Sequence, residues 1–474
     1  MNKKPLCIDC DGTLITTDLL FEAFFLMLKQ YPLGLFFLPF WLFKGKAYLK
    51  EKLAQHVNFN WQTLPYRESV LNLIESSRKD GRPIVLVTAS PLLWAKGVAN
   101  YLACFDQVLA TEKGVNLAGK NKAAHLVKLY GERGFDYAGD SAVDLHVWAY
   151  ADSAIVVSQN RSLAKQAALK ANSVQIAQTP PTKFLIHLRA LRIHQWVKNL
   201  LVIVPLLAAH QLHSLQSLTQ VVYAFLAFSL CASSVYVLND LLDLDSDRQH
   251  VRKRKRPFAA CSIPLWQGML MMPMLLGAAF TLSLLLPAKF TLVLAVYFVM
   301  TLAYSVRLKR QVIVDVMLLA SLYTMRIIAG AAATAIKPSF WLLAFSMFIF
   351  LSLALVKRYS ELLISLQSSK QEAAGRGYSI NDLPLLMSIG TSAGLGSVLI
   401  LSLYLNNPET NIMYPNTTWL WLMPPLLLYW TSRIWIKAHR GQVDDDPVVF
   451  AARDWQSLLV LFLSACIFVA ALKF

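Results

Sequence analysis

Two clusters of acidic residues have the spacing of metal-assisted phosphate chemistry. In the first, Asp9 and Asp11 lie two residues apart in DCDGTLI, and GDSAVD supplies Asp140 and Asp144 further along the chain. A carboxylate can attack phosphorus if a hard cation neutralises both anions, and further carboxylates are needed to hold that cation. The N-terminal acids therefore indicate phosphoryl transfer through a metal-supported carboxylate.

The second cluster is NDLLDLDSDRQHVRKRKRP, residues 239–257, which lies between two long apolar runs. Asn239, Asp243 and Asp247 are spaced i, i+4 and i+8, so on a helix they form one polar stripe, with Asp240 beside it. Carboxylates at the mouth of a membrane span are costly unless they bind cations, and Mg²⁺ bridged to a diphosphate is a natural partner.

A basic run follows these acids and contains Lys253, Arg254 and Arg256. These cations can neutralise phosphate oxygens. A loop that only fixed the membrane topology would need the bases but not the regularly spaced acids, so the pattern favours a diphosphate site.

The composition is that of a membrane protein. The 474 residues are 56% hydrophobic and 15% charged, with a mean hydropathy of +0.46. The net charge of +17 is typical of cytoplasmic loops and phosphate-bearing partners in a membrane protein, and we expect no nucleic-acid partner. The six cysteines are scattered, so a disulfide framework is not expected, and the CxxC spacing of CIDC lacks a second ligand pair for zinc.

The elements that must position these residues fall into two domains. Residues 1–178 alternate buried strands with helical stretches, as PLCIDCDGTLI, PIVLVTAS and DYAGDS illustrate, and predict a soluble α/β domain. A linker is expected at 179–186, followed by an all-α membrane domain at 187–474.

Nine apolar stretches in the second domain approach the roughly 20 residues that a membrane-spanning helix needs. They lie at 197–213, 217–238, 264–286, 290–306, 312–335, 339–356, 383–405, 417–436 and 456–472. The loops after the even-numbered stretches are strongly charged, whereas the opposite loops hold only Lys289 and Lys337. The positive-inside rule therefore places the charged loops and the N-terminal domain in the cytoplasm.

The segment 24–43 is apolar enough to suggest a further span. One crossing there would put Asp9 and Asp140 on opposite sides of the membrane, although both belong to one site. We expect helices broken at Pro32 and Pro39 that lie against or dip into the inner leaflet, or that form an ordinary apolar cap over the site.

The N-terminal motifs DCDGTLI, VLVTAS, NKAAHL and GDSAVD, in this order, resemble the haloacid dehalogenase superfamily of phosphotransferases. The resemblance implies a Rossmann-like α/β fold with a helical cap between the first two motifs, and a Mg²⁺ ion. It makes Asp9 the nucleophile and Asp11 the general acid and base. The remaining roles are phosphoryl binding by Thr88 and Lys122, and metal binding by Asp9, Asp11, Asp140 and Asp144.

The stretch from Asn239 to the KRKRP run, together with YSVRLKRQVIVDV, resembles the two Asp-rich motifs of the UbiA superfamily of intramembrane prenyltransferases. That family has nine helices around a cytoplasm-facing cavity. RIHQWVKN, KRKRPFAA, LALVKRYSEL and RGQVDDDPVVFAARD are similar to its polyprenyl-phosphate phosphoribosyltransferase branch, of the decaprenyl-phosphate phosphoribosyltransferase type.

This second resemblance assigns roles to residues of the membrane domain. It implies a second Mg²⁺ on the catalytic residues Asn239, Asp243 and Asp247. The implied phosphate-binding residues are Lys198, Lys253, Arg254, Arg256, Lys309 and Lys357. The implied substrate-binding residues are Asn199, Asp240, His250, Tyr304, Asp315 and Arg326, of which Arg326 could instead form a structural intramembrane pair.

The two resemblances together imply a bifunctional enzyme of a bacterial cytoplasmic membrane. The membrane domain would move 5-phosphoribose from phosphoribosyl pyrophosphate to a polyprenyl phosphate, and the soluble domain would then remove the 5-phosphate. One alternative is an aromatic prenyltransferase of quinone or related lipid biosynthesis with an accessory phosphatase. A second alternative is a transporter or lipid-binding scaffold with a regulatory phosphatase.

Overall fold

The computed structural model describes residues 3–112, 116–158, 160–176, 185–367, 377–407, 414, 416–443 and 446–473. The predicted linker at 179–186 lies outside this set as far as residue 184. The chain divides into two compact units. The first combines Met1–Leu191 with Val237–Met271, and the second combines Arg192–Tyr236 with Met272–Phe474. The Asp-rich stretch 239–257 therefore belongs to the same unit as the N-terminal part of the chain.

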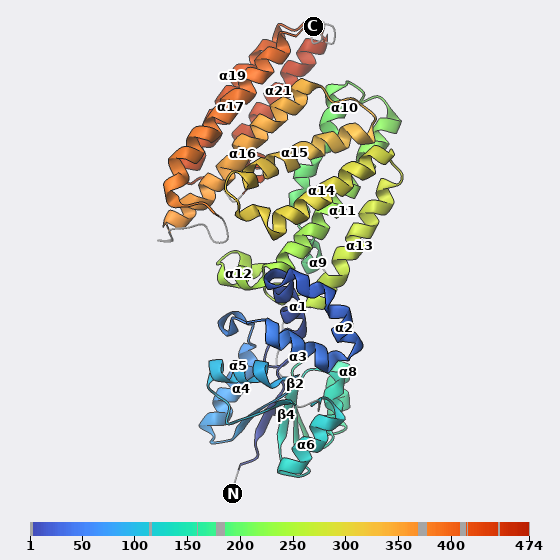
Figure 1. Ribbon diagram of the computed structural model, residues 1–474, viewed down its shortest axis with the longest axis vertical. Helices are drawn as coiled ribbons and strands as arrows, with labels where there is room; N and C mark the ends of the chain where they lie inside the picture. The colour runs from blue at the N-terminus through green and yellow to red at the C-terminus, as the bar shows by residue number, and fades with distance from the viewer. Residues whose placement is uncertain are drawn as a thin grey trace. The chain divides into compact units, whose positions relative to one another are not determined.

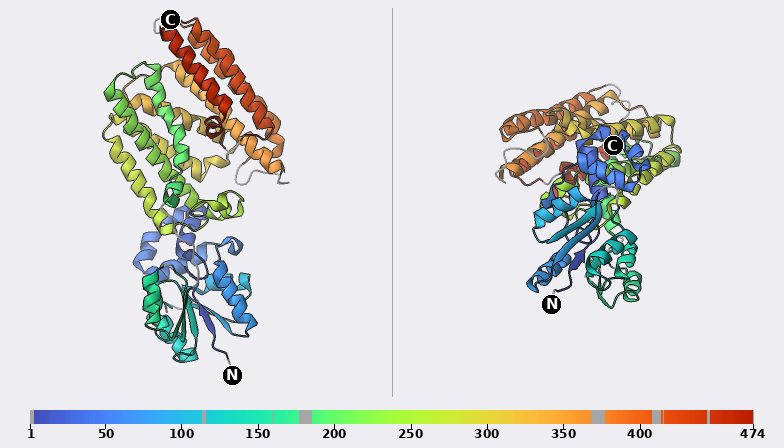
Figure 2. Two further views of the ribbon diagram at one scale, coloured as in Figure 1. Left: turned by 180° about the vertical axis from the view of Figure 1, so that it is seen from behind. Right: turned by 60° about the horizontal axis from the view of Figure 1, so that its bottom comes forward.

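A six-stranded sheet in the order β3-β2-β1-β4-β5-β6 forms the centre of the first unit, and every neighbouring pair of strands is parallel. The strands are β1 (Leu6–Ile8), β2 (Ile84–Pro91), β3 (Gln107–Thr111), β4 (Asp136–Gly139), β5 (Ser153–Val156) and β6 (Ser173–Ile176). Helices lie on both sides of this sheet (Figures 1 and 2), so the residues of the central strands β1 and β2 are nearly all buried rather than alternately buried and exposed.

The order of the strands determines where a ligand can bind. β1 pairs with β2 on one side and with β4 on the other. The chain adds β2 and β3 outward on the first side and then β4, β5 and β6 outward on the second, so the strand order reverses at β1. The crevice beyond the carboxyl ends of strands at such a switch point is the usual ligand site of an open α/β sheet. The helices that complete this α/β layer are α4 (Glu68–Lys79), α5 (Leu92–Leu102), α6 (Lys120–Tyr130), η3 (Ala142–Asp144), α7 (Leu145–Trp148) and α8 (Arg161–Ala168).

A helical insertion follows β1, as predicted for a cap. It consists of α1 (Leu19–Gln30), η1 (Pro32–Phe36), α2 (Leu38–Phe43), α3 (Lys46–His56) and η2 (Trp61–Thr63). A break falls at Pro32 as expected, whereas the second falls at Phe37, because Pro39 sits in the first turn of α2, where its missing N–H costs nothing.

The segment 24–43 has a buried and an exposed set of apolar side chains, and its contact with the membrane stays a prediction. Phe25 and Met27 are buried in the core of the first unit, as in an apolar cap. Phe36, Phe40 and Phe43 are exposed, Phe43 to 91%, as in a segment that contacts lipid.

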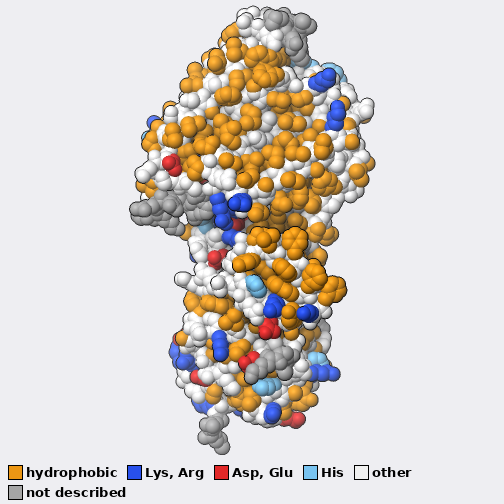
Figure 3. Space-filling model, viewed as in Figure 1, with side chains coloured by type: hydrophobic (Ala, Val, Ile, Leu, Met, Phe, Trp, Pro, Cys, Tyr) orange, Lys and Arg blue, Asp and Glu red, His pale blue; other side chains and the backbone are white. Residues whose placement is uncertain are grey.

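The remaining elements are helical. They are α9 (Leu185–Ala190), η4 (Ile193–Ile203), α10 (Val204–Ala208), α11 (Leu215–Leu242), α12 (Leu244–Gln249), η5 (Lys253–Lys255), α13 (Leu265–Ser283), α14 (Ala288–Val306), η6 (Leu308–Arg310), α15 (Val314–Ala333), α16 (Phe340–Gln367), η7 (Ile380–Asp382), α17 (Leu383–Leu405), η8 (Trp419–Leu422), α19 (Met423–His439), α20 (Pro447–Ala451) and α21 (Trp455–Lys473). Hydrophobic side chains cover most of the face of the second unit that Figure 3 shows.

Within the described residues, seven helices are long and apolar enough to cross a membrane: α11, α13, α14, α15, α16, α17 with η7, and α21. The predicted count of nine is therefore not confirmed. The predicted span at 197–213 overlaps the shorter apolar stretch Ile193–Ala208, and that at 417–436 overlaps α19, whose 17 residues include Arg433 and Lys437. Because it has these seven long apolar helices, the chain is an integral membrane protein.

Candidate active sites

Three neighbouring strands bring the N-terminal motifs to one edge of the sheet. Asp9 directly follows β1, Thr88 lies near the end of β2, and Asp140 directly follows β4. Because parallel strands end at the same edge, residues that are more than 130 positions apart in the sequence meet there. This edge is the candidate phosphatase site.

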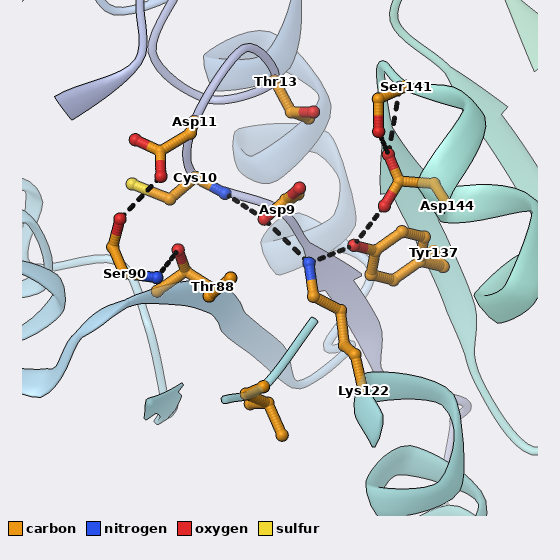
Figure 4. A network of polar contacts seen from close by, with 12 residues as sticks. Asp9, Cys10, Asp11, Thr13, Thr88, Ser90, Lys122, Tyr137, Ser141 and Asp144 are labelled. Carbon is orange, nitrogen blue, oxygen red and sulfur yellow. Dashed lines mark hydrogen bonds and ion pairs between the residues drawn. The ribbon is translucent and has the colours of Figure 1, made fainter. Parts of the chain in front are cut away.

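Lys122, at the start of α6, connects the two ends of this site (Figure 4). Its Nζ lies 3.0 Å from Asp9 Oδ1 and donates to the Tyr137 hydroxyl at 2.8 Å. Tyr137 in turn donates to Asp144 Oδ1 at 3.0 Å. Asp144 Oδ2 also accepts from the backbone and the hydroxyl of Ser141 at 3.0 and 2.9 Å, so its orientation is fixed. The expected positions of Asp9, Lys122 and Asp144 in one site are thus found.

Asp9, Asp140 and Asp144 have the arrangement of a metal site. One oxygen from each lies within 4.8 Å of the others, and this is the one group of three potential ligands that meets that distance among the described residues. Three hard carboxylate oxygens suit Mg²⁺. Burial raises the pKa of Asp9 to about 6 and that of Asp140 to about 7. The Asp144 carboxylate adds to both shifts and Asp9 adds to that of Asp140, whereas Lys122 opposes the shift at Asp9. A divalent cation would relieve this mutual repulsion.

Gly12 allows Asp140 to approach. Its φ of +78° is in the left-handed region, and a Cβ placed there would lie 2.3 Å from Asp140 Oδ2. Thr13 donates its hydroxyl to Asp140 Oδ1 at 3.1 Å, which holds the carboxylate against this glycine. The G-T pair of the motif thereby sets the position of a candidate metal ligand.

Asp11 lies on the other side of Asp9 and has different partners (Figure 4). Its Oδ1 accepts from the backbone N–H of Leu19 at 2.9 Å, and its Oδ2 accepts from the Ser90 hydroxyl at 2.6 Å. Lys50, from the cap helix α3, lies 3.4 Å from Asp11 Oδ2 and 3.1 Å from Ser90 Oγ. The side chain of Asp11 is therefore outside the three-carboxylate cluster, in a position suited to proton transfer rather than metal binding.

Sequence analysis missed Lys50 and Ser90. Ser90 stands two residues after Thr88 in VTAS, and its backbone N–H donates to the Thr88 hydroxyl at 3.0 Å, so strand alternation could have identified it. No sequence pattern marks Lys50, because a single lysine in a helix is normally predicted to lie on the surface. Its side chain is only 8% exposed.

The Asp-rich stretch keeps its predicted stripe although α11 ends at Leu242. The backbone N–H of Asp243 donates to the Asn239 carbonyl at 2.9 Å, and that of Asp247 donates to the Asp243 carbonyl at 2.8 Å. These are i to i−4 helical bonds, so the three residues lie one turn apart along one face. The break between α11 and α12 falls at Asp243 itself.

Cations neutralise the acids of this stripe. Arg256 lies 2.6 Å from Asp247 and 3.3 Å from Asp240, both of which are 2% exposed as whole residues. Lys29 Nζ, from α1, lies 3.4 Å from Asp243 Oδ1. The donor set of carboxylates and an amide suits a hard cation, with Arg256 placed to compensate charge on an anionic ligand.

The other predicted phosphate ligands of this stretch are positioned by a short turn. Lys253 and Arg254 lie in η5, where Lys253 is half-buried and Arg254 exposed. His250 Nδ1 accepts from the backbone N–H groups of Arg252 and Lys253 at 3.2 and 3.4 Å, which orders the turn.

In the second unit, Asp315 is fully buried in an ion pair. Arg358 Nε donates to its carboxylate, and the Tyr378 hydroxyl donates to it at 2.5 Å. Arg358 also donates to the Tyr304 hydroxyl at 2.8 Å. These contacts bring together two predicted substrate-binding residues, Asp315 and Tyr304, through an arginine that had no assigned role.

A second buried network of this unit contains Lys198, Asn199 and Arg326. Lys198 is buried and forms an ion pair with Asp446. Arg326 Nε donates to Asn199 Oδ1 at 2.9 Å, and its Nη2 donates to the Tyr297 hydroxyl at 3.1 Å. The guanidinium is held on all sides, which favours the structural reading of Arg326. Lys309, in η6, and Lys357, in α16, are both half-buried.

Both parts of the chain match known protein families. Residues 200–458 match the UbiA prenyltransferase family, and residues 6–154 match the haloacid dehalogenase-like hydrolases. The chain therefore belongs to the UbiA prenyltransferase family and carries a haloacid dehalogenase-like hydrolase in its N-terminal part.

Individual relatives cover different parts of the chain. Protein y4nM of Sinorhizobium fredii is 38% identical over 475 residues, which span 99% of this chain and 91% of that protein. The decaprenyl-phosphate phosphoribosyltransferase of Mycobacterium tuberculosis is 37% identical over 195 residues, which span 40% of this chain and 65% of that protein. A solved UbiA homolog from Archaeoglobus fulgidus, bound to GPP and Mg²⁺, is 16% identical with a TM-score of 0.46, covering 61% of this chain and all of that one.

Proposed function

We propose that the chain catalyses two consecutive reactions on a membrane lipid. In the first, an oxygen of a polyprenyl phosphate forms a bond to C1 of phosphoribosyl pyrophosphate while the bond from C1 to the diphosphate breaks. The products are a phosphoribosyl lipid and diphosphate. In the second, the N-terminal domain hydrolyses the 5-phosphate, which leaves polyprenyl-phosphoryl ribose and phosphate.

The observation that carries the first reaction is the similarity to decaprenyl-phosphate phosphoribosyltransferase in the membrane part. The stripe of Asn239, Asp243 and Asp247 on one helical face supports it, since diphosphate release needs hard metal ligands beside cations. Arg256, Lys253 and Arg254 follow this stripe within ten residues and would bind the departing diphosphate. Lys198 would bind the lipid phosphate after exchanging its contact with Asp446.

The phosphatase site supports the second reaction. Asp9 would attack the 5-phosphorus, so that a P–O bond to Asp9 forms as the bond to the ribose oxygen breaks. Asp11, held by Leu19, Ser90 and Lys50, would give a proton to that oxygen and later take one from the water that hydrolyses the aspartyl phosphate. Thr88 and Lys122 would bind the phosphoryl oxygens.

Mg²⁺ would be held by Asp9, Asp140 and Asp144 in the phosphatase, and by Asn239, Asp243 and Asp247 in the transferase. In both sites it would neutralise charge that develops on phosphate oxygens. We further propose that the bundle has nine crossings, with Ile193–Ala208 and α19 as the two shorter ones, and that the phosphatase faces the cytoplasm, where phosphoribosyl pyrophosphate is available.

The transferase step is tested with the purified chain, labelled phosphoribosyl pyrophosphate and a polyprenyl phosphate. We expect a labelled lipid whose formation is lost in Asp247→Asn and kept in Asp152→Asn, a matched change on the distant surface. No labelled lipid from phosphoribosyl pyrophosphate, together with prenylation of 4-hydroxybenzoate when a polyprenyl diphosphate is supplied, would instead identify an aromatic prenyltransferase.

The phosphatase step is tested with Asp9→Asn. This change removes the nucleophile but keeps a hydrogen-bonding side chain beside Lys122. We expect the 5-phosphorylated lipid to accumulate in place of polyprenyl-phosphoryl ribose. Release of phosphate from that lipid by Asp9→Asn at the parent rate would refute the coupling.

A further inference from the structure

The helix α1 contacts residues of both proposed active sites. At its first residue, the backbone N–H of Leu19 donates to Asp11 of the phosphatase at 2.9 Å. At its last turn, Lys29 Nζ lies 3.4 Å from Asp243 of the Asp-rich stretch. Both contacts lie within the first compact unit, which contains residues 237–271 together with the N-terminal part. One helix of 12 residues thereby links the two sets of catalytic acids.

The central contact of α1 is an ion pair between Glu22 and Arg248. Arg248 Nη2 lies 2.6 Å from Glu22 Oε1, and Nη1 donates to Oε2 at 3.2 Å, so the pair is bidentate. The two side chains are 4% and 9% exposed. A desolvated, two-pronged contact fixes direction as well as distance.

Arg248 also holds the far end of the Asp-rich stretch. Its Nε donates to the Ala259 carbonyl at 3.2 Å, and its Nη2 lies 3.7 Å from Cys261 Sγ. Because Arg248 directly follows Asp247, the same guanidinium connects the metal-binding stripe, the end of the basic run and the phosphatase cap.

A second contact on the same side comes from the cap turn η2, where the Thr63 hydroxyl donates to Asp245. On a helix, Asp245 and Arg248 lie on one face, whereas Asp240, Asp243 and Asp247 lie on another. The phosphatase part therefore contacts mainly a different face of the helix from the one that carries the proposed metal ligands. Lys29 is the exception, because it contacts Asp243 at the edge of that face.

The packing around these polar contacts is close. Phe25 of α1 and Leu241 and Leu244 of the Asp-rich stretch are each at most 4% exposed, and they line a cavity of about 20 Å³ beside Glu22 and Arg248. That volume holds about one water molecule. The contact is thus a packed interface with a buried ion pair rather than a loose approach of two surfaces.

We propose that α1 positions the transferase's metal-binding stripe, with Glu22 acting through Arg248 as the positioning residue. This inference rests on the proposed function of Asn239, Asp243 and Asp247 as ligands of the diphosphate-bound cation. Residues that orient metal ligands from behind change metal affinity or activity by about 10- to 100-fold when they are lost. The transferase then depends on the folded phosphatase cap.

The test uses the full chain in detergent and the change Glu22→Gln, which keeps the shape of the side chain but removes its charge. We expect the Mg²⁺ concentration for half-maximal transfer to rise about tenfold or more, while hydrolysis of p-nitrophenyl phosphate at the phosphatase stays within twofold. The matched control is Glu75→Gln, which removes an exposed ion pair with Lys79 on α4 and should change neither quantity.

Since Glu22→Gln leaves Arg248 buried without its counter-ion, a second variant separates positioning from folding. Glu22→Met combined with Arg248→Met removes both charges and keeps apolar volume. If this variant keeps the phosphatase rate but still needs about tenfold more Mg²⁺ for transfer, the pair positions the stripe. A parent-like Mg²⁺ requirement in this double variant would overturn the proposal.

Mn²⁺ binding measured by electron paramagnetic resonance gives a readout that does not depend on the reaction. In an Asp140→Asn background, which weakens the phosphatase cluster, Glu22→Gln should weaken the remaining Mn²⁺ site by about tenfold. Weakened binding in a chain that makes no phosphoribosyl lipid would leave this inference standing and refute the proposed transfer. Unchanged Mn²⁺ binding in a chain that makes the phosphoribosyl lipid would refute this inference and leave the proposed transfer standing.

Discussion

Replacing Gly12 by alanine should displace Asp140, a proposed metal ligand, without replacing any charged residue. The new Cβ would lie 2.3 Å from Asp140 Oδ2, whereas ordinary van der Waals contact begins at 3.4 Å, so the carboxylate must retreat by about 1 Å. A displacement of that size in a catalytic group can cost about 100-fold in rate. The left-handed φ of +78° adds about 1–2 kcal/mol of backbone strain for any residue with a Cβ.

The chain offers a control that separates the two effects. Gly81 also has a left-handed φ, +67°, but nothing lies within 4 Å of its Cβ position, so Gly81→Ala imposes the strain alone. Both variants are assayed for hydrolysis of p-nitrophenyl phosphate over a range of Mg²⁺ concentrations. We expect Gly12→Ala to lose about 100-fold in rate and to need about tenfold more Mg²⁺, with Gly81→Ala close to the parent. Equal Mg²⁺ requirements in the two variants would refute the metal-ligand role of Asp140.

Three further predictions concern other groups. Lys50→Met should lower kcat of the phosphatase about tenfold or more with little change in KM, because it removes the cation beside Asp11 and Ser90. Lys50→Arg should recover part of that loss. A change confined to KM would contradict this role of Lys50. The Mg²⁺ requirement of the phosphatase should rise as the pH falls through 7 and 6, because the raised pKa values of Asp9 and Asp140 let protons compete with the metal in that range; a requirement independent of pH between 5 and 8 would contradict it. Asp315→Leu should destabilise the second unit by about 1–3 kcal/mol, since buried Arg358 loses one of its two carboxylate partners among the described residues and keeps only Glu361. Asp315→Leu with Arg358→Leu should recover the melting temperature; recovery of transferase activity as well would show that Asp315 is structural and does not bind substrate.

The phosphatase site was predictable because its residues sit in short local motifs. Asp9 and Asp140 each directly follow a strand and Thr88 lies in the second half of β2, and parallel strands bring such positions together whatever the intervening sequence is. The i, i+4 spacing likewise predicted the stripe of Asn239, Asp243 and Asp247, and their helical hydrogen bonds survive the break at Asp243.

The contacts that sequence analysis missed are single residues joined over long distances in the chain. Glu22 and Arg248 are separated by 226 positions, and Lys50 and Asp11 by 39. Glu22, Arg248 and Lys50 are each a single charge on a helix with no motif around them, and only tertiary packing makes them buried partners. The count of nine spans was not confirmed, because hydropathy reports apolar length but not helix breaks, and Pro205 and Pro424 each stand at the start of a short α-helix in the two stretches concerned.

The most direct test of the two-step account is the lipid composition of cells that produce the chain, measured by mass spectrometry. Cells with the parent chain should contain polyprenyl-phosphoryl ribose, and cells with Asp9→Asn should contain a lipid heavier by one phosphate. Cells with Asp247→Asn should contain neither lipid. The same ribosylated lipid in all three strains, or no ribosylated lipid in any of them, would contradict the account.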